Sequence, residues 1–325
     1  MPELTDILLQ PVKKEMKMYN DTFDSYMSVD NPLLNNILKD MSRHKGKGMR
    51  PLITLLAAKL FGEVPDICYH LAAAYELFHN ATLIHDDIID ESDTRRGQPS
   101  LYSLFGSRIA VLAGDYVLTN SLISSITTNR IDLMKVVFEA SRCLVDGELF
   151  QLHNISLEEI SEENYMEIIR RKTAVLFSSC AKSGAMTNTD NADDIRNVAD
   201  FGMFVGMCFQ IKDDIFDYIA GEEIGKPRGN DMLEGKLTLP AIHVLLTVSN
   251  DEIYEIARKV KEGSADQEEI QSLIRFTIDN GGIEYAYQVM QEYADKAKKI
   301  LDFYPDSDVK SALISYVDYV IQRNF

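Results

Sequence analysis

The sequence has little that would interrupt a helix. Of its 325 residues, 9 are proline and 17 are glycine, the two residue types that most often end a helix. Long segments such as residues 200–219 and 285–302 instead carry apolar residues at three- and four-residue spacing, which indicates helices with one buried face. Convincing strand alternation is absent, so we predict an all-α protein with about ten or more helices.

Positive charge is also scarce. Lysine and arginine total 33 against 51 aspartates and glutamates, which gives a formal net charge of −18. Nucleic acids and anionic membrane surfaces attract basic proteins, so we expect no nucleic-acid partner and no such membrane binding. An anionic substrate stays compatible with this composition, because a bound cation reverses the local field.

Long apolar runs and cysteine motifs are missing as well. The sequence contains no run of about 18 apolar residues, so we predict no membrane span. Its N-terminus does not resemble a secretion signal. The cysteines form no CxxC pair and no metal-ligand spacing; they are Cys68, Cys143, Cys180 and Cys208. We therefore expect reduced core thiols in a cytoplasmic protein.

The composition is sufficient for a globular core, with 46% hydrophobic and 26% charged residues. Short breaks separate the predicted helices near residues 62–66, 94–100, 187–194, 221–231, 262–268 and 303–308. None is long or biased enough to be an interdomain linker. We predict a single domain over residues 1–325.

Two aspartate clusters of the form Asp-Asp-x-x-Asp are the most informative feature. They are Asp86, Asp87 and Asp90, and Asp213, Asp214 and Asp217. On a helix this spacing is expected to gather three carboxylates on one patch, which needs a cation. Mg²⁺ suits such oxygen ligands together with substrate phosphates, whereas zinc would need cysteine or histidine companions. A solvated acidic face is the alternative, and the second copy disfavours it.

Basic residues accompany both clusters, as a diphosphate site requires. They are Arg95 and Arg96 after the first cluster, Lys226 and Lys236 after the second, and Lys47, Arg50 and Lys172 elsewhere. Arginine makes multidentate phosphate contacts and lysine supplies a point charge. Carboxylates and cations together predict metal-assisted diphosphate binding.

In these motifs the sequence resembles the trans-type polyprenyl diphosphate synthases. Five matching segments follow one another in the family's order, at residues 46–51, 76–97, 110–116, 172–177 and 209–240. The first segment departs from the family pattern Gly-Gly-Lys-Arg-x-Arg-Pro, because Lys45 replaces a glycine and Gly48 replaces an arginine. The conformation of this loop is therefore left open.

The resemblance implies an all-α helical bundle around a deep central cavity, usually as a homodimer. Three Mg²⁺ ions are expected to bridge the two clusters to the diphosphate of an allylic substrate. Loss of that diphosphate leaves an allylic cation, which isopentenyl diphosphate attacks in a head-to-tail (1′-4) condensation. A long product is expected to be handed to a membrane.

The same resemblance implies a role for each candidate residue. The expected metal ligands are Asp86, Asp87, Asp90, Asp213 and Asp214, with Asp217 acting directly or through water. The residues expected to bind the allylic diphosphate are Arg95, Lys172, Lys226 and Lys236. Those expected to bind isopentenyl diphosphate are Lys47, Arg50, His79 and Arg96. Thr173 and Gln210 are expected to line the reacting centre. For His79 and Gln210, a capping or core role is the alternative.

The small residues one helical turn below the first aspartate cluster predict a long product. Ala81 and Thr82 lie one turn below Asp86, where relatives with short products carry bulky aromatic residues. Leu118, Leu122 and Ile126 offer a second wall, and Phe78 could bound the tunnel. A helix of about 20 residues is ~30 Å long and would accommodate on the order of six or more isoprene units. A tight helix contact is the alternative explanation for Ala81.

Rival functions stay open at this stage. Within the same chemistry, the alternative is a geranylgeranyl or farnesyl diphosphate synthase. A non-catalytic partner subunit is a second alternative, although such a subunit is expected to lose its aspartate clusters. A terpene cyclase would carry a different second motif, and a metal-dependent phosphohydrolase, suggested by the pair His85-Asp86, would need several more histidine ligands.

Overall fold

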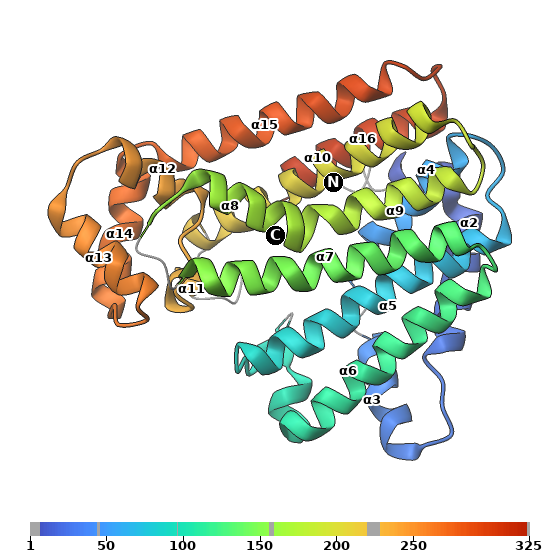
Figure 1. Ribbon diagram of the computed structural model, residues 1–325, viewed down its shortest axis with the longest axis horizontal. Coiled ribbons are helices and arrows are strands. Elements are labelled where there is room, and N and C mark those ends of the chain that lie inside the picture. Colours follow the sequence, from blue (N-terminus) through green and yellow to red (C-terminus); the bar gives the residue numbers. More distant parts are fainter. Residues whose placement is uncertain (1–6, 44–45, 96, 156–158, 220–227, 324–325) are drawn as a thin grey trace. The chain divides into compact units, whose positions relative to one another are not determined.

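The computed structural model describes residues 7–43, 46–95, 97–155, 159–219 and 228–323, and these are almost entirely helical (Figure 1). The helices are η1 (Gln10–Val12), α2 (Lys13–Tyr26), α3 (Pro32–Arg43), α4 (Met49–Lys59), α5 (Asp66–Ile89), α6 (Leu101–Thr127), α7 (Ile131–Ile155), α8 (Glu162–Ile169), η2 (Arg170–Ala174), α9 (Val175–Met186), α10 (Ala192–Ile219), α11 (Asn230–Leu233), α12 (Leu239–Thr247), α13 (Asp251–Lys261), α14 (Gln267–Asp279), α15 (Gly282–Leu301) and α16 (Asp308–Gln322). The strands are β1 (Thr94–Arg95) and β2 (Gln98–Pro99). The predicted all-α class is confirmed.

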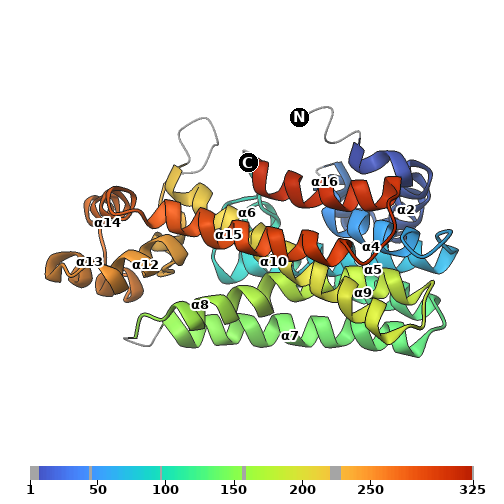
Figure 2. The same ribbon diagram turned by 90° about the horizontal axis from the view of Figure 1, so that it is seen from above.

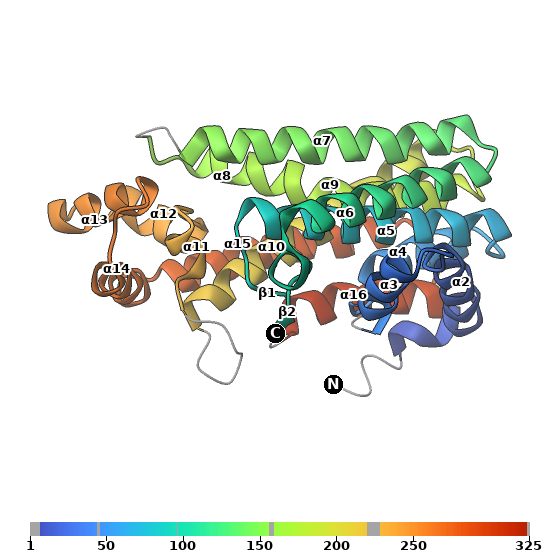
Figure 3. The same ribbon diagram turned by 90° about the horizontal axis from the view of Figure 1, so that it is seen from below.

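Most predicted breaks between helices are confirmed. Four of them separate α4 from α5, α9 from α10, α13 from α14, and α15 from α16. The break near residues 94–100 holds a small hairpin in which β1 pairs antiparallel with β2 (Figure 3). The glycines of the break at 221–231, namely Gly221, Gly225 and Gly229, predict a loop that closes over the site, but most of this segment lies outside the described residues.

Contacts within the chain divide it into two compact units. The first comprises residues 1–141, 176–202 and 300–316, and the second comprises residues 142–175, 203–299 and 317–325. Some helices, such as α7 and α10, contribute residues to both units. The single domain over residues 1–325 and its central cavity remain predictions.

In the first unit, α5 and α6 lie side by side (Figures 1 and 3). Ser121 of α6 donates a hydrogen bond of 2.7 Å to the carbonyl oxygen of Ala74 on α5. At Gly114 a Cβ atom would lie 2.4 Å from Nε2 of His85. Small and hydroxyl side chains therefore allow the close approach, which fixes one face of α5 against α6.

By length and composition alone, helix α6 is long and apolar enough to cross a membrane, although the sequence predicts no membrane span. An 18-residue window within it has a mean hydropathy of 1.4, and 44% of that window is buried inside the fold. Asn120, Ser121 and Ser124 are among its buried polar residues, which is typical of a helix packed on protein neighbours. It is kinked at Gly106, whose φ of +76° favours glycine.

The second unit contains the bundle of α12, α13 and α14, in which α14 packs on the other two (Figure 2). Asn250 caps the start of α13 by accepting a hydrogen bond from the backbone N–H of Ile253. Asp266 and Glu269 form a reciprocal capping box at the start of α14. These caps satisfy N–H groups that have no partner within the helix and so fix where each helix begins.

All four thiols are free, and three of them are buried. Burial raises the pKa of Cys68, Cys180 and Cys208 to about 12. A thiol with so high a pKa is a poor nucleophile and a poor metal ligand at neutral pH. These three lie in the core, as expected from the sequence, whereas Cys143 is only partly buried.

Candidate functional site

Helix α5 places the three carboxylates of the first cluster in different environments. Asp87 is only 4% exposed and forms an ion pair with Arg95, whose Nε donates to Oδ1 at 2.8 Å. Asp86 is partly exposed, and Asp90 at the end of α5 is exposed. Successive helical residues point about 100° apart, so the middle carboxylate turns to protein partners. The expectation of one shared patch does not hold for Asp87.

A cavity of about 220 Å³ in the first unit collects three of the predicted residues. Lys47, Asp87 and Arg95 line it together with Glu76 and Tyr19. Burial, and after it the charge of Glu76, raises the pKa of Tyr19 well above its ordinary value. The cavity thus combines two cations with buried acidic groups.

The backbone conformation of the loop before α4 explains why Gly48 stands where the family pattern has arginine. Gly48 precedes the first residue of α4 with φ of +63°, in the left-handed region where other residues are strained. Lys47 beside it is exposed, and the guanidinium of Arg50 lies 4.9 Å from the ring centre of Phe177. Lys45 lies outside the described residues. Gly48 therefore fits the observed backbone, which explains the departure from arginine.

Ala81 and Thr82 lie on different faces of α5. Ala81 is 1% exposed and precedes His85 by four residues, on the stripe that packs against Gly114 of α6. Thr82 is partly exposed, and its hydroxyl donates to the carbonyl oxygen of His79 at 2.9 Å. Ala81 is therefore buried and Thr82 is partly exposed, and the chain-length role of both residues stays a prediction.

Helix α10 gives the carboxylates of the second cluster equally different partners. Asp214 is 4% exposed, whereas 41% of the Asp213 side chain is exposed. Asp217 accepts hydrogen bonds from the backbone N–H groups of Asn230 and Asp231 at 2.9 and 3.3 Å. It therefore holds the start of α11 close to the cluster.

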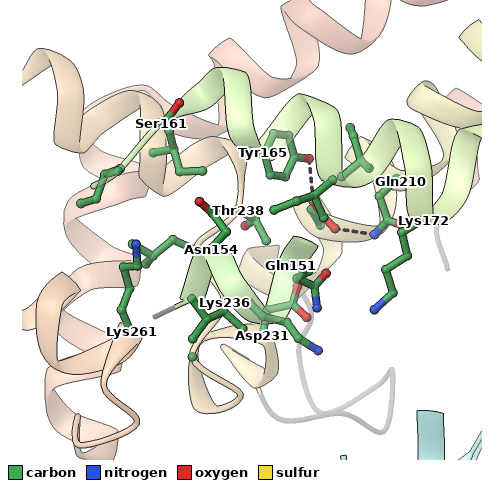
Figure 4. A pocket seen from close by; sticks show the side chains of 18 of the residues that line it. Gln151, Asn154, Ser161, Tyr165, Lys172, Gln210, Asp231, Lys236, Thr238 and Lys261 are labelled. Atoms are coloured by element: carbon green, nitrogen blue, oxygen red, sulfur yellow. Dashed lines mark hydrogen bonds between the residues drawn. The ribbon is translucent and has the colours of Figure 1, made fainter. Parts of the chain in front are cut away.

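Asp214 is the centre of a buried hydrogen-bond network, of which Figure 4 labels Tyr165 and Gln210. The Tyr165 hydroxyl donates to Oδ2 at 2.6 Å, and the Gln210 amide donates to Oδ1 at 2.8 Å. The Thr173 hydroxyl donates in turn to Oε1 of Gln210 at 2.6 Å. Burial and the charge of Asp231 raise the pKa of Asp214, and the two donated hydrogen bonds oppose that rise.

Lys172 and Thr173 belong to a π-helical turn, η2, which interrupts the helical register. Two glycines hold this turn closely. A Cβ atom at Gly147 would lie 2.7 Å from Cβ of Arg171, and one at Gly206 would lie 2.5 Å from Cα of Ala174. π-helical turns often occur at functional sites, and here the turn directs Lys172 to Glu148, at 2.5 Å.

A second cavity, of about 140 Å³, lies within the second unit and gathers the other predicted residues (Figure 4). Its lining includes Lys172, Thr173, Gln210, Asp214 and Lys236. The ammonium group of Lys236 lies 2.5 Å from Glu234. Each of the two lysines is therefore held by a glutamate, and a bound diphosphate would compete for both.

Arg323, near the C-terminus, is a partner that the sequence analysis missed. It is 7% exposed, and its Nη2 donates to Asp213 at 2.7 Å and to the carbonyl oxygen of Phe209 at 2.8 Å. Its guanidinium also lies 3.9 Å from the Phe209 ring centre. An ion pair between residues 110 positions apart leaves no local signal in the sequence. Tyr165 and Glu148 were missed for the same reason.

Among the described residues, no three Asp, Glu, His or Cys side chains already form a metal-binding group. Arg96 and Lys226, both predicted phosphate ligands, lie outside the described residues. The partly exposed oxygens of Asp86, Asp90, Asp213 and Asp217 nevertheless fit Mg²⁺, which usually takes one or two carboxylates and completes its shell with waters and phosphates.

The chain is similar to known proteins over nearly its whole length. The family model for polyprenyl synthetase matches residues 31–277. The octaprenyl diphosphate synthase of Escherichia coli (strain K12) is 32% identical over 312 residues, 96% of each chain. The crystal structure of a geranylgeranyl pyrophosphate synthase from Bacteroides thetaiotaomicron has a TM-score of 0.88 and 40% identity, over 99% of this chain and 100% of that one. A polyprenyl synthase from Caulobacter crescentus CB15, complexed with calcium and isoprenyl diphosphate, has a TM-score of 0.91 and 31% identity, over 98% of each.

Proposed function

The chain belongs to the polyprenyl synthetases, the trans-type prenyl diphosphate synthases, and from this premise we propose that it makes a long-chain all-trans polyprenyl diphosphate. Enzymes of this family are Mg²⁺-dependent prenyltransferases that condense isopentenyl diphosphate with an allylic diphosphate. The observation that carries the proposal is the presence of both aspartate clusters, whose outer carboxylates are partly or fully exposed, in a chain that matches the family along most of its length.

The outer carboxylates are the proposed metal ligands. Asp86 and Asp90 hold Mg²⁺ at the first cluster, and Asp213 and Asp217 at the second, with three ions per site. The ions supply positive charge where the departing diphosphate becomes negative. The buried middle residues act through protein partners, because Asp87 orients Arg95 and Asp214 orients Gln210.

The basic residues divide between the two substrates. Arg95, Lys172 and Lys236, with Lys226, hold the allylic diphosphate, and Lys47, Arg50, His79 and Arg96 hold isopentenyl diphosphate. Lys172 and Lys236 exchange their glutamate partners for phosphate oxygens when the substrate binds, which keeps both ammonium groups paired throughout. Binding in this way avoids leaving an unpaired charge in a cavity.

The product is long, since Thr82 leaves space one turn below Asp86. The likeness to an octaprenyl diphosphate synthase supports this length. A geranylgeranyl diphosphate product is the second candidate, favoured by the 40% identity to the Bacteroides thetaiotaomicron enzyme. The chain acts in the cytoplasm as one domain and passes its product to a membrane.

The active form is a homodimer in which α6 contributes the contact. Its exposed side includes large apolar residues, namely Leu104, Leu112, Ile123 and Ile126, with exposed fractions from 48% to 68%. Exposed apolar residues in such number on one helix indicate a protein contact. Burial of this surface against a second copy would remove it from water.

A product assay tests the function. The purified protein is incubated with Mg²⁺, labelled isopentenyl diphosphate and farnesyl diphosphate, and the dephosphorylated products are separated by length. We expect a ladder that ends in a long prenyl alcohol and that EDTA abolishes. Asp86→Ala should lower the rate by about 100-fold or more, the effect of losing a few kcal/mol of transition-state stabilisation. No elongation of any allylic primer by the folded protein would favour a non-catalytic partner subunit.

A further inference from the structure

Tyr165 is absent from the predicted site, yet it directly contacts the second aspartate cluster. It lies on α8, is 4% exposed, and donates its hydroxyl hydrogen to Oδ2 of Asp214 at 2.6 Å. Asp214 is itself 4% exposed. A buried hydroxyl and a buried carboxylate thus satisfy each other, away from the exposed side of the cluster.

The hydrogen bonds beyond Asp214 have a fixed direction. The amide nitrogen of Gln210 donates to Oδ1 of Asp214 at 2.8 Å, so the amide oxygen points the other way. The amide oxygen then faces Thr173 and can only accept from its hydroxyl, at 2.6 Å. The carboxylate at one end therefore determines which atom of each following group is the donor.

This series of hydrogen bonds ends at the hydroxyl oxygen of Thr173, which can act as an acceptor. The single hydroxyl hydrogen of Thr173 is used by Gln210, so its remaining lone pairs are available to other groups. Hydrogen bonds that run in one direction polarise one another, which makes the last oxygen more electron-rich. Thr173 lines the 140 Å³ cavity, where an electron-rich oxygen favours a positive charge.

We propose that Tyr165 and Asp214 are positioning residues that fix the Gln210 amide and the Thr173 hydroxyl, so that Thr173 presents an acceptor oxygen to the developing allylic cation. Asp214 acts through these hydrogen bonds and is not a metal ligand. The inference rests on the proposed function, because the cation belongs to that reaction. It separates Asp214 from its neighbour Asp213, whose side chain is 41% exposed.

Asp214→Asn is the first test. Asparagine places an NH2 donor where Asp214 has one of its two acceptor oxygens, so the donor that faced this oxygen, Tyr165 or Gln210, loses its acceptor and must turn. We expect kcat to fall by about 10- to 100-fold, the effect of misplaced catalytic groups. The Mg²⁺ concentration that gives half-maximal rate should change by less than about twofold, because a positioning residue does not hold the metal.

Asp213→Asn is the matched control, since the same substitution is made one residue away on the same helix. It should raise the Mg²⁺ concentration for half-maximal rate by about tenfold or more, as expected for a lost ligand. If Asp214→Asn shifts the Mg²⁺ dependence as far as Asp213→Asn does, Asp214 is a metal ligand and the proposal is wrong.

Tyr165→Phe provides a second variant in case Asp214→Asn does not fold. It leaves every carboxylate in place and removes one donor, so kcat should fall by about fivefold or more with unchanged Mg²⁺ dependence. A wild-type kcat in Tyr165→Phe would overturn the role of the network.

Metal binding without turnover separates this inference from the proposed function. Mn²⁺ binding in the presence of inorganic diphosphate, followed by electron paramagnetic resonance, should be retained in Asp214→Asn and weakened in Asp213→Asn. An inactive wild type with this binding pattern would reject the function and keep Asp214 out of the metal site. Loss of Mn²⁺ binding in Asp214→Asn would reject the inference alone.

Discussion

Residue by residue, α5 shows how one step along a helix changes what a side chain can do. Thr82 is partly exposed and its hydroxyl donates to the carbonyl oxygen of His79, while Ala81 is buried. Thr82→Phe should therefore place an aromatic ring one turn below Asp86 and shorten the product by several isoprene units. Product length in the ladder assay measures this, and an unchanged ladder would refute the role of Thr82.

Ala81→Phe is the matched substitution on the packed face. An aromatic ring cannot fit where Gly114 already brings α6 against His85, so the variant should lose about 1–3 kcal/mol of stability. Thermal unfolding compares the two variants. Equal melting temperatures for Thr82→Phe and Ala81→Phe would show that both residues face open space.

For the two aspartate clusters, the sequence predicts the secondary structure but not which carboxylates are buried. Their spacing predicts carboxylates on helices, and the structure confirms helices α5 and α10. It does not reveal that Asp87 and Asp214 face inward, because burial depends on Arg95 and Tyr165 and on how other elements fold back. Pairs that form across the fold leave no periodic pattern in the sequence.

Among the elements, helix boundaries follow from local residues, while helix irregularities do not. Asn250 and Asp266 mark two helix starts that capping residues explain. The π-helical turn η2 has no such mark, because it depends on the close approach of Gly147 and Gly206 from other helices. Sequence alone therefore identifies Lys172 and Thr173 as candidates but not the turn that directs them.

The attachment of α2 to α5 is expected to weaken in acid. The Tyr26 hydroxyl lies 3.0 Å from Nδ1 of His70, and burial lowers the pKa of His70 below its ordinary value of 6.5, although Asp66 opposes the change. The unfolded chain then binds this proton more readily than the folded chain. Stability from the neutral ring is therefore present above about pH 6.5 and lost as the pH falls through the lowered pKa.

A pH series of melting temperatures tests this attachment. Between pH 7.5 and pH 5.5 the wild type should lose more stability than His70→Gln, which has no proton to gain. A His70→Gln curve parallel to the wild type would show that this ring does not couple folding to pH.

For the whole molecule, composition predicts the fold class and motifs predict the family. Which side chains are exposed at the surface is known only from the structure. The helical spacing of Leu118, Leu122 and Ile126 predicts that α6 forms a wall of the product tunnel. Leu118 and Leu122 are half-buried, whereas Ile126 is 52% exposed. The hydropathy of α6 alone would also suit a membrane span. The buried serines of α6 indicate instead that it packs on other parts of the protein.

The exposed side of α6 yields the last prediction, which concerns assembly. If this surface joins two copies, the wild type should have twice the chain mass of 36.8 kDa in light scattering after size-exclusion chromatography. Leu112→Glu, at a 68% exposed position, should shift it to the monomer mass, since a buried unpaired charge is costly. Phe303→Glu, on a residue that is 73% exposed outside α6, should leave the dimer intact. A monomeric wild type, or dissociation by Phe303→Glu instead of Leu112→Glu, would remove α6 from the contact.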